Sequence, residues 1–263
     1  MRPAELGELE AFRDLYAAAP PELGARSEEI DGALCLRLEP LSTVTMFNRA
    51  LGLGIEQPAT DEQLDAVLAF LRGVEAYVTV APEAGPPDLG DRLAARGLAP
   101  ERGWTKFSRP TAAPPEATTE LRVERDETGE AFAEAATRGF GVPPFFADWL
   151  RPLAGREGWQ CFAAFDGDAP AAAGALFVTG SVGWVGIGAP APEHRGKGGQ
   201  SALLAARIDA AAAAGCELVV TETGEPVDGQ PNGSYRNILR AGFEPQYVRP
   251  NYLSAIAASY ART

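Results

Sequence analysis

Histidine and cysteine are scarce in this sequence, and their scarcity excludes several kinds of chemistry. His194 is the single histidine among 263 residues, so a Ser-His-Asp triad would have to rest on it, and a zinc site with several histidines is excluded. The cysteines Cys35, Cys161 and Cys216 lie far apart and form no CxxC pair, which favours structural thiols over disulfides or a metal site. We therefore expect no metal, and most hydrolase and metalloenzyme interpretations fall away.

Long apolar runs and a surplus of basic residues are also absent. No uncharged stretch approaches the roughly 18 apolar residues of a membrane span, and the start MRPAELGELEAF lacks the apolar segment of a signal peptide. We expect a soluble, cytoplasmic protein that binds no membrane. The formal net charge of −13 argues against nucleic acid as a partner, because phosphate binding relies on a basic surface. The charge suits a cationic substrate, or it serves solubility alone.

A stretch rich in proline and alanine interrupts the middle of the chain. Residues 109–120 read RPTAAPPEATTE, with little periodicity, so we predict a linker between two globular parts. The segments RLAARGLAPE and NILRAGFEPQ occupy the same place in two similar series of elements, which indicates an internal duplication. The predicted organisation is a domain at 1–110, a linker at 111–119 and a second domain at 120–263.

Both halves are expected to alternate strands and helices. In the first half we predict strands at TVTMFNRALGLG, AYVTVAP and WTKFSR, and helices at DEQLDAVLAFLRG and PPDLGDRLAARGLAPE. In the second half the order is a strand, two helices, a hairpin turning at Asp166-Gly167, then the strand SVGWVGIG, the helix QSALLAARIDAAAAAG, the strand CELVVTET, a helix ending at Gly242 and the strand YVRPNYL. The fold class expected is α/β, with a mixed, mostly antiparallel sheet and helices on both faces.

A glycine-rich turn, HRGKGGQS at 194–201, stands directly before the alanine-rich helix. Glycines let several backbone N–H groups converge on one point, and the start of a helix adds about half a positive charge, so the turn suits a phosphate. A P-loop is excluded because Lys197 is followed by Gly198. GIGAPA, residues 186–191, is disfavoured as a dinucleotide-binding turn because the prolines in and after it prevent a helix there.

The first half differs at the corresponding place. It reads GIEQPATDEQ, with a proline and no run of glycines. The carboxylates of Glu56, Asp61 and Glu62 would repel a phosphate. We therefore expect the first half to be structural.

The turn HRGKGGQSALL, the strand before it and the helix PNGSYRNILRAGF after it resemble the GNAT superfamily of acyl-coenzyme A-dependent N-acetyltransferases. The resemblance covers residues 120–252, and the first half looks like a degenerate copy, which implies tandem GNAT-like domains with acetyl-coenzyme A as co-substrate. In that family the turn binds the coenzyme A pyrophosphate. Here this implies contacts from Arg195, Gly196, Lys197, Gly198, Gly199, Gln200 and Ser201. Gln200 departs from the family's small residue, and its side chain either donates to a phosphate or crowds it.

The resemblance also implies a gap between the strands before and after this helix, filled by the pantetheine arm. Candidates for its backbone contacts are Ile187, Gly188, Ala189 and Ala191, whereas Pro190 has no N–H to donate. The next helix would add Asn232 and Ser234. Asn232 is equally suited to be the N-cap of that helix.

Acyl transfer to an amine requires a base, because an alkyl ammonium has a pKa of about 10.4. We favour Glu222, which strand alternation groups with inward residues, so that burial would raise the pKa of its carboxyl. Glu225 is the alternative, and an exposed carboxylate without this role is as compatible with the pattern. A backbone N–H at Gly188 or Ala189 would stabilise the negative charge on the acyl oxygen.

The residue that protonates the departing thiolate is less well defined. The family's usual tyrosine falls at Ile238 here. Tyr235, one helical turn away, is the candidate, and Tyr252 is the alternative. Tyr235 is equally suited to packing, in which case solvent supplies the proton.

Three classes of function follow. The leading hypothesis is a transferase that moves an acetyl group from acetyl-coenzyme A to a primary amine of a small molecule or peptide. The second is a non-catalytic sensor that binds acyl-coenzyme A, and the third is a structural protein whose turn binds nothing. Acceptor contacts would come from RGFGVPPFFADWL and GEPVDGQPNG. We expect a small-molecule amine as partner, no nucleic acid, and either a monomer or a homodimer.

Overall fold

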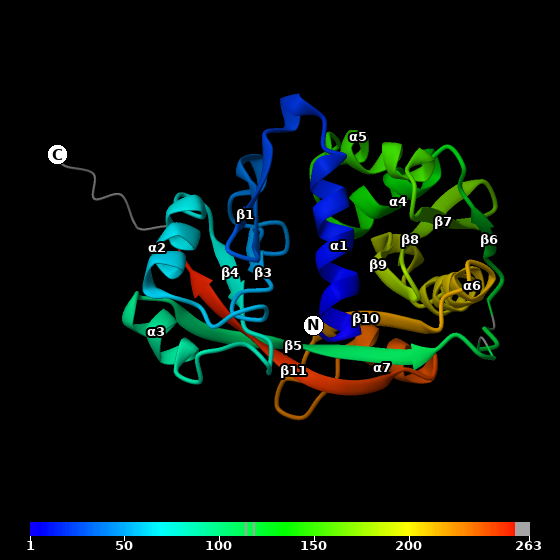
Figure 1. Ribbon diagram of the computed structural model, residues 1–263. Helices are drawn as coiled ribbons and strands as arrows, with labels where there is room; N and C mark the ends of the chain where they lie inside the picture. The colour runs from blue at the N-terminus through cyan, green and yellow to red at the C-terminus, as the bar shows by residue number, and fades with distance from the viewer. Residues whose placement is uncertain (114, 118, 256–263) are drawn as a thin grey trace. The chain divides into compact units, whose positions relative to one another are not determined.

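The computed structural model describes residues 1–113, 115–117 and 119–255, and it divides into two compact units (Figure 1). Among the described residues, unit 1 contains Met1, Phe12–Trp104 and residues 248–255, and unit 2 contains Arg2–Ala11 and Thr105–Tyr247. The boundary thus passes through helix α1 (Pro3–Ala17) and strands β5 (Ala99–Pro110) and β11 (Glu244–Ser254). These units do not coincide with the predicted domains 1–110 and 120–263, which stay a prediction.

Unit 1 is built on short strands and two helices. Strands β1 (Ala25–Ile30), β2 (Ala33–Leu38) and β3 (Arg49–Leu51) pair antiparallel, β3 pairs parallel with β4 (Ala76–Thr79), and residues 251–254 of β11 pair antiparallel with β4. Helices α2 (Asp61–Phe70) and α3 (Leu89–Ala95) bury Leu64, Val67 and Leu93 against Val78. The strand predicted at TVTMFNRALGLG is shorter than expected, because turns occupy its first residues.

Unit 2 contains the predicted second series of elements. They are β6 (Arg122–Arg125), α4 (Glu130–Phe140), α5 (Phe146–Leu150), β7 (Trp159–Asp166), β8 (Ala169–Thr179), β9 (Val182–Pro190), α6 (Gly199–Ala213), β10 (Leu218–Gly224), α7 (Gly233–Arg240) and the start of β11. Strands β6 to β9 pair antiparallel in chain order, and β10 pairs parallel with β9. β5 is the next strand beyond β10. The expected α/β class with a mixed sheet is confirmed.

The sheet of unit 2 is covered on both faces. On one face, Leu203, Ile208 and Ile238 of α6 and α7 pack in one cluster with Val185 and Val219. On the other face, Gly7 of α1 lies against Val182, Trp184 and Val220, where an added Cβ would come within 2.9 Å of a Val220 methyl. Because side chains alternate along a strand, the two sets mark opposite faces.

The cysteines lie in the interior, and the helices of the described residues are short or polar. All three cysteines are free thiols and buried, and burial raises the pKa of the Cys35 thiol to about 12. Of the helices in the described part of the chain, none is both long enough and apolar enough to cross a membrane.

Candidate functional site

The parallel strands β9 and β10 separate partway along their length. Their register runs from Val182–Leu218 to Trp184–Val220, and the hydroxyl of Thr221 donates to the Val185 carbonyl at 2.8 Å. Beyond that point β9 continues to Pro190 and β10 to Gly224, with no further pairing between them in the described chain. The strands therefore stop pairing where the family resemblance implies a gap, and the pantetheine site there stays a prediction.

A β-bulge reshapes β9 beside this gap. Ala173 pairs with Ala189 but Ala175 pairs with Gly186, so β9 carries one extra residue. Ile187 has a φ of +50°, a left-handed conformation that a β-branched residue adopts at a cost of about 1–3 kcal/mol. The bulge takes the half-buried peptides of Ile187 and Gly188 out of the regular ladder.

The turn before α6 requires glycine at three positions. Gly196 and Gly198 have φ values of +84° and +82°, and a Cβ on Gly199 would come within 2.9 Å of a Leu121 methyl carbon. Gly198 is the N-cap and offers no side-chain acceptor. Among the residues that the structure describes, no backbone carbonyl accepts from the amides of Gly196, Gly198, Gly199, Gln200 and Ser201. The turn therefore presents a cluster of available donors at a helix start.

Three side-chain contacts fix the surroundings of this turn. The ammonium of Lys197 forms an ion pair with Asp166, and His194 Nδ1 lies 3.0 Å from the same carboxylate. The hydrogen bond from Lys197 holds the pKa of Asp166 below its usual range. The Thr119 hydroxyl donates to the Lys197 carbonyl at 2.7 Å. Arg195 is exposed, and no carboxylate of the described chain lies within ion-pair distance of it.

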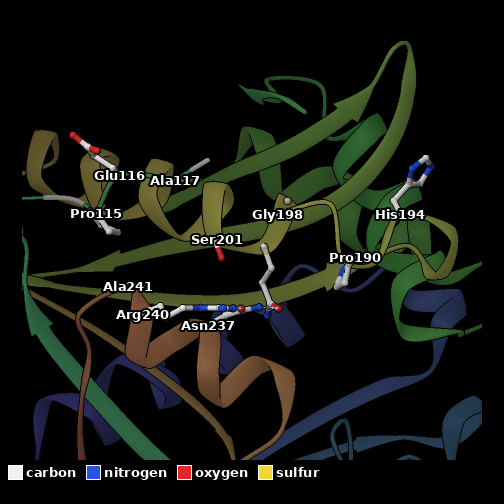
Figure 2. Close-up of a pocket in the computed structure, with 13 residues that line it drawn as sticks. Pro115, Glu116, Ala117, Pro190, His194, Gly198, Ser201, Asn237, Arg240 and Ala241 are labelled. Atoms are coloured by element: carbon white, nitrogen blue, oxygen red, sulfur yellow. Dashed lines mark hydrogen bonds between the residues drawn. The ribbon is translucent and has the colours of Figure 1, made fainter. Parts of the chain in front are cut away.

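A cavity of about 500 Å³ opens beside the turn (Figure 2). Figure 2 shows Ser201 of α6 pointing toward Asn237 and Arg240 of α7 across this space. The lining residues are Pro115, Glu116, Ala117, Pro190, His194, Gly196, Gly198, Gly199, Gln200, Ser201, Asn237, Arg240 and Ala241. Sequence reasoning missed Asn237 and Arg240, although Asn237 follows Ser234 by three residues and Arg240 follows Asn237 by three, a spacing that makes neighbours on a helix.

Gln200 connects the two helices that flank the cavity. Its side-chain amide donates to the Ser234 hydroxyl at 3.3 Å, and Asn237 donates to its carbonyl oxygen at 2.8 Å. Asn232 is the N-cap of α7, where its oxygen accepts from the Tyr235 amide at 2.8 Å and its nitrogen donates to the Gly224 carbonyl. Gln200, Ser234 and Asn232 thus hold α6, α7 and β10 together beside the cavity.

The candidate acids lie in different surroundings. The Tyr235 ring packs edge-on against Phe107, with ring centroids 4.9 Å apart, at the margin of the core cluster. Tyr252 belongs to unit 1, where its hydroxyl lies close to Gly90.

The backbone amide of Ala191, a predicted contact of the pantetheine arm, already has a partner in the protein. It donates to the Ala171 carbonyl at 2.9 Å.

Glu222 lies on the diverging part of β10 within a buried group of charges. Lys106 Nζ is 3.1 Å from a Glu222 oxygen and 2.7 Å from a Glu8 oxygen, and the Trp184 indole N–H lies 3.3 Å from both Glu222 oxygens. The side chain of Glu222 is 5% exposed and that of Lys106 is fully buried. Sequence reasoning missed Lys106 and Glu8, because they are 116 and 214 positions away from Glu222 and no local pattern connects them.

Arg207 of α6 is a second buried charge near the gap. Its side chain lies under the bulge of β9, where Nη1 donates to the carbonyls of Gly186 at 3.0 Å and Ala175 at 3.3 Å. Burial lowers the pKa of this guanidinium to about 9, so it stays charged at neutral pH.

No protein-family model matches the sequence, and no curated protein matches it. Solved structures do resemble it. A GCN5-related N-acetyltransferase from Kribbella flavida is 17% identical, with a TM-score of 0.59 over 98% of this chain and 97% of its own. A tandem GNAT protein from the clavulanic acid biosynthesis pathway is 18% identical, with a TM-score of 0.56 over 85% of this chain and 78% of its own.

A GNAT-family protein from Novosphingobium aromaticivorans, described as a possible acetyltransferase, is 17% identical, with a TM-score of 0.53 over 93% of this chain and 96% of its own. These likenesses extend over both units, as the expectation of tandem GNAT-like halves requires. The chain therefore has the fold of the GCN5-related N-acetyltransferases.

Proposed function

We propose that unit 2 is an acyltransferase that moves an acetyl group from acetyl-coenzyme A to a primary amine. One observation carries the proposal: the available amides at the start of α6 open on a 500 Å³ cavity that Pro190, at the end of the diverging strand β9, also lines. A phosphate group and an extended arm fit these two adjacent features.

The residues present fit coenzyme A as follows. The amides of residues 196–201 would hold the pyrophosphate, with charge from Arg195 and Arg240. Lys197 contributes less, because Asp166 neutralises it. The backbone at Ile187 and Gly188, beside the bulge, would bind the pantetheine arm, whereas the amide of Ala191 is already engaged by Ala171. Asn232 and Ser234 shape the cavity through the contacts of α7 rather than through free donors.

The thioester supplies an activated acyl group. The amine nitrogen forms a bond to the acyl carbon, the bond from that carbon to sulfur breaks, the nitrogen loses one proton and the sulfur gains one. An amide N–H at Gly188 or Ala189 would stabilise the charge on the acyl oxygen, a contribution of roughly 3 kcal/mol. We propose Glu222 as the group that takes the proton from nitrogen, with Glu225 as the alternative. Because Tyr235 packs against Phe107, we propose that solvent protonates the thiolate.

The test is thiol release from acetyl-coenzyme A in the presence of a panel of primary amines, including diamines and amino acid amides. We expect release that depends on one class of amine, and a 100-fold or greater loss in Glu222→Gln, on the order of what a general base contributes. Glu225→Gln tests the alternative base on the same segment. A loss in Glu225→Gln alone would assign the role to Glu225, and unchanged thiol release in both variants would assign it to neither residue.

A second candidate is an acyl-coenzyme A sensor without catalysis. The observation that favours it is the engagement of both Glu222 oxygens by Lys106 and Trp184. A sensor binds acetyl-coenzyme A, as detected by calorimetry, but releases no thiol with any amine. Failure to bind any coenzyme A ester contradicts both candidates.

A further inference from the structure

The guanidinium of Arg207 lies between two glycines of the sheet. A Cβ on Gly174 would come within 2.7 Å of Arg207 Cζ, and a Cβ on Gly188 would lie 3.7 Å from Nη2. Gly174 on β8 therefore makes room for the group, and Gly188 on β9 leaves its peptide directly next to it. The position is on the α6 side of the sheet, under the bulge.

The charge of Arg207 has no counter-charge nearby. The side chain is 2% exposed, its Nε donates to the Leu203 carbonyl at 2.9 Å, and no carboxylate of the described residues lies within 4.0 Å of it. A buried cation without a counter-ion is costly even when carbonyls accept its hydrogen bonds, so proteins rarely keep one for stability alone. In surroundings of low dielectric its field reaches neighbouring groups with little screening.

The hydrogen bonds of Arg207 also define the bulge. The carbonyls of Gly186 and Ala175 stand opposite each other at the last regular pair before the extra residue, and Nη1 bonds to both. A bulge disrupts the ladder locally, and the guanidinium supplies donors at that point.

We propose that Arg207 is a positioning residue for acyl transfer, which holds the β9 bulge and favours negative charge on an acyl oxygen next to Gly188. The inference rests on the proposed function. The guanidinium does not touch the acyl group and acts through the peptides of the bulge. Its positive charge stabilises the developing oxyanion more than the neutral thioester, so it changes the rate more than the binding.

The test uses Arg207→Met, which keeps most of the volume, and Arg207→Lys, which keeps the charge. The first readout is the infrared carbonyl stretch of carbonyl-¹³C acetyl-coenzyme A bound to each protein. We expect the stretch to lie at lower wavenumber on the wild type than in water, to return toward the water value in Arg207→Met, and to be partly restored in Arg207→Lys. With a reactive amine, kcat falls on the order of 10- to 100-fold in Arg207→Met while KM for acetyl-coenzyme A stays within about threefold.

The outcomes separate the inference from the proposed function. No binding of acetyl-coenzyme A to the wild type overturns both. If the wild type binds acetyl-coenzyme A and releases thiol, and Arg207→Met leaves the carbonyl stretch and kcat unchanged, only the inference is overturned. The same holds if Arg207→Met loses binding and Arg207→Lys does not restore it. If Arg207→Met does not fold, Gly174→Ala is the test variant, because its added methyl group displaces the guanidinium without removing it. A carbonyl stretch in Gly174→Ala at the wild-type wavenumber contradicts the inference.

Discussion

The two units differ in the loops that follow their pair of parallel strands. In unit 1 the loops that follow β3 and β4 are joined by backbone hydrogen bonds, since the Gly85 amide donates to the Gly54 carbonyl at 2.9 Å and the Ala59 amide donates to the Gly85 carbonyl at 2.8 Å. In unit 2 no such bond joins the loops after β9 and β10 in the described chain. The loops after the parallel strands are therefore joined by backbone hydrogen bonds in unit 1 but not in the described part of unit 2.

The starts of helices α2 and α6 differ in their N-caps and in the charge of their first turns. Thr60 caps α2 by accepting from the Gln63 amide, and its first turn carries Asp61 and Glu62. The start of α6 has glycine as its cap and no acid in its first turn. Each unit also has a threonine whose hydroxyl donates to the neighbouring parallel strand, Thr79 on β4 and Thr221 on β10, but Val80 follows the first and Glu222 the second. The start of α6 therefore has the features of the proposed phosphate site, and the start of α2 lacks them.

The largest effect is expected from Ser201→Glu, which gives α6 the acidic first turn of α2. Repulsion of the pyrophosphate by a carboxylate costs several kcal/mol, so the affinity for coenzyme A measured by calorimetry should fall by about 1,000-fold. The fold should tolerate the change, because an acid favours a helix start. The matched control, Asp61→Asn with Glu62→Gln in unit 1, should create no second site, and binding by this control at a new site would break the comparison.

The second prediction concerns the buried charges of unit 2. Lys106→Met removes the buried ammonium that lies 2.7 Å from Glu8 and 3.1 Å from Glu222, and it should lower the free energy of unfolding by about 3–5 kcal/mol, as measured in urea. Lys197→Met is the control, because its ion pair with Asp166 is exposed and is worth less than about 1 kcal/mol. Equal stability of both variants would show that the Lys106 ion pairs do not stabilise unit 2.

A smaller effect is expected from the cations at the cavity. Arg195→Ala and Arg240→Ala should each weaken coenzyme A binding by about tenfold at low salt and less at high salt. Arg236→Ala is the control on α7, since Arg236 donates to the Pro231 carbonyl at 2.5 Å and does not line the cavity. A comparable loss in the control would point to a general effect of net charge instead.

The smallest effect is expected from Asp126 in unit 2, whose carboxylate caps the backbone amides of Thr128, Gly129 and Phe132 at the start of α4. Burial raises the pKa of Asp126, but hydrogen bonds from the Phe132 amide, the Thr128 hydroxyl and the Gly129 and Thr128 amides outweigh it and hold the pKa below its ordinary value. Asp126→Asn should therefore cost about 1 kcal/mol at pH 7.

The pH dependence of this cost has a definite sign. Because the folded pKa of Asp126 is lowered, its contribution is complete above the unfolded value of about 3.9 and is lost as pH falls through the folded value. The difference between wild type and Asp126→Asn in urea unfolding should shrink in acid. Exposed Asp209→Asn on α6 is the control, with an effect within about 0.5 kcal/mol. A difference that persists below the folded pKa would rule out the cap.

Local patterns predicted much of unit 2, and long-range contacts could not be predicted. The glycines at 196, 198 and 199, the hairpin at Asp166-Gly167 and the helix after the turn follow from turn chemistry and periodicity within a few residues. Helix α1 was missed, although it supplies Glu8. Arg207 in an alanine-rich helix has no local sign of burial, since its environment depends on glycines of two distant strands.

We propose that unit 2 binds coenzyme A at the turn before α6 and that unit 1 binds none. The most direct measurement is a titration of ¹⁵N-glycine-labelled protein with coenzyme A, followed by the amide resonances. We expect saturable shifts of the Gly196, Gly198 and Gly199 resonances and unchanged resonances of Gly54 and Gly85. Shifts at Gly54 and Gly85, or none at the α6 turn, would contradict it.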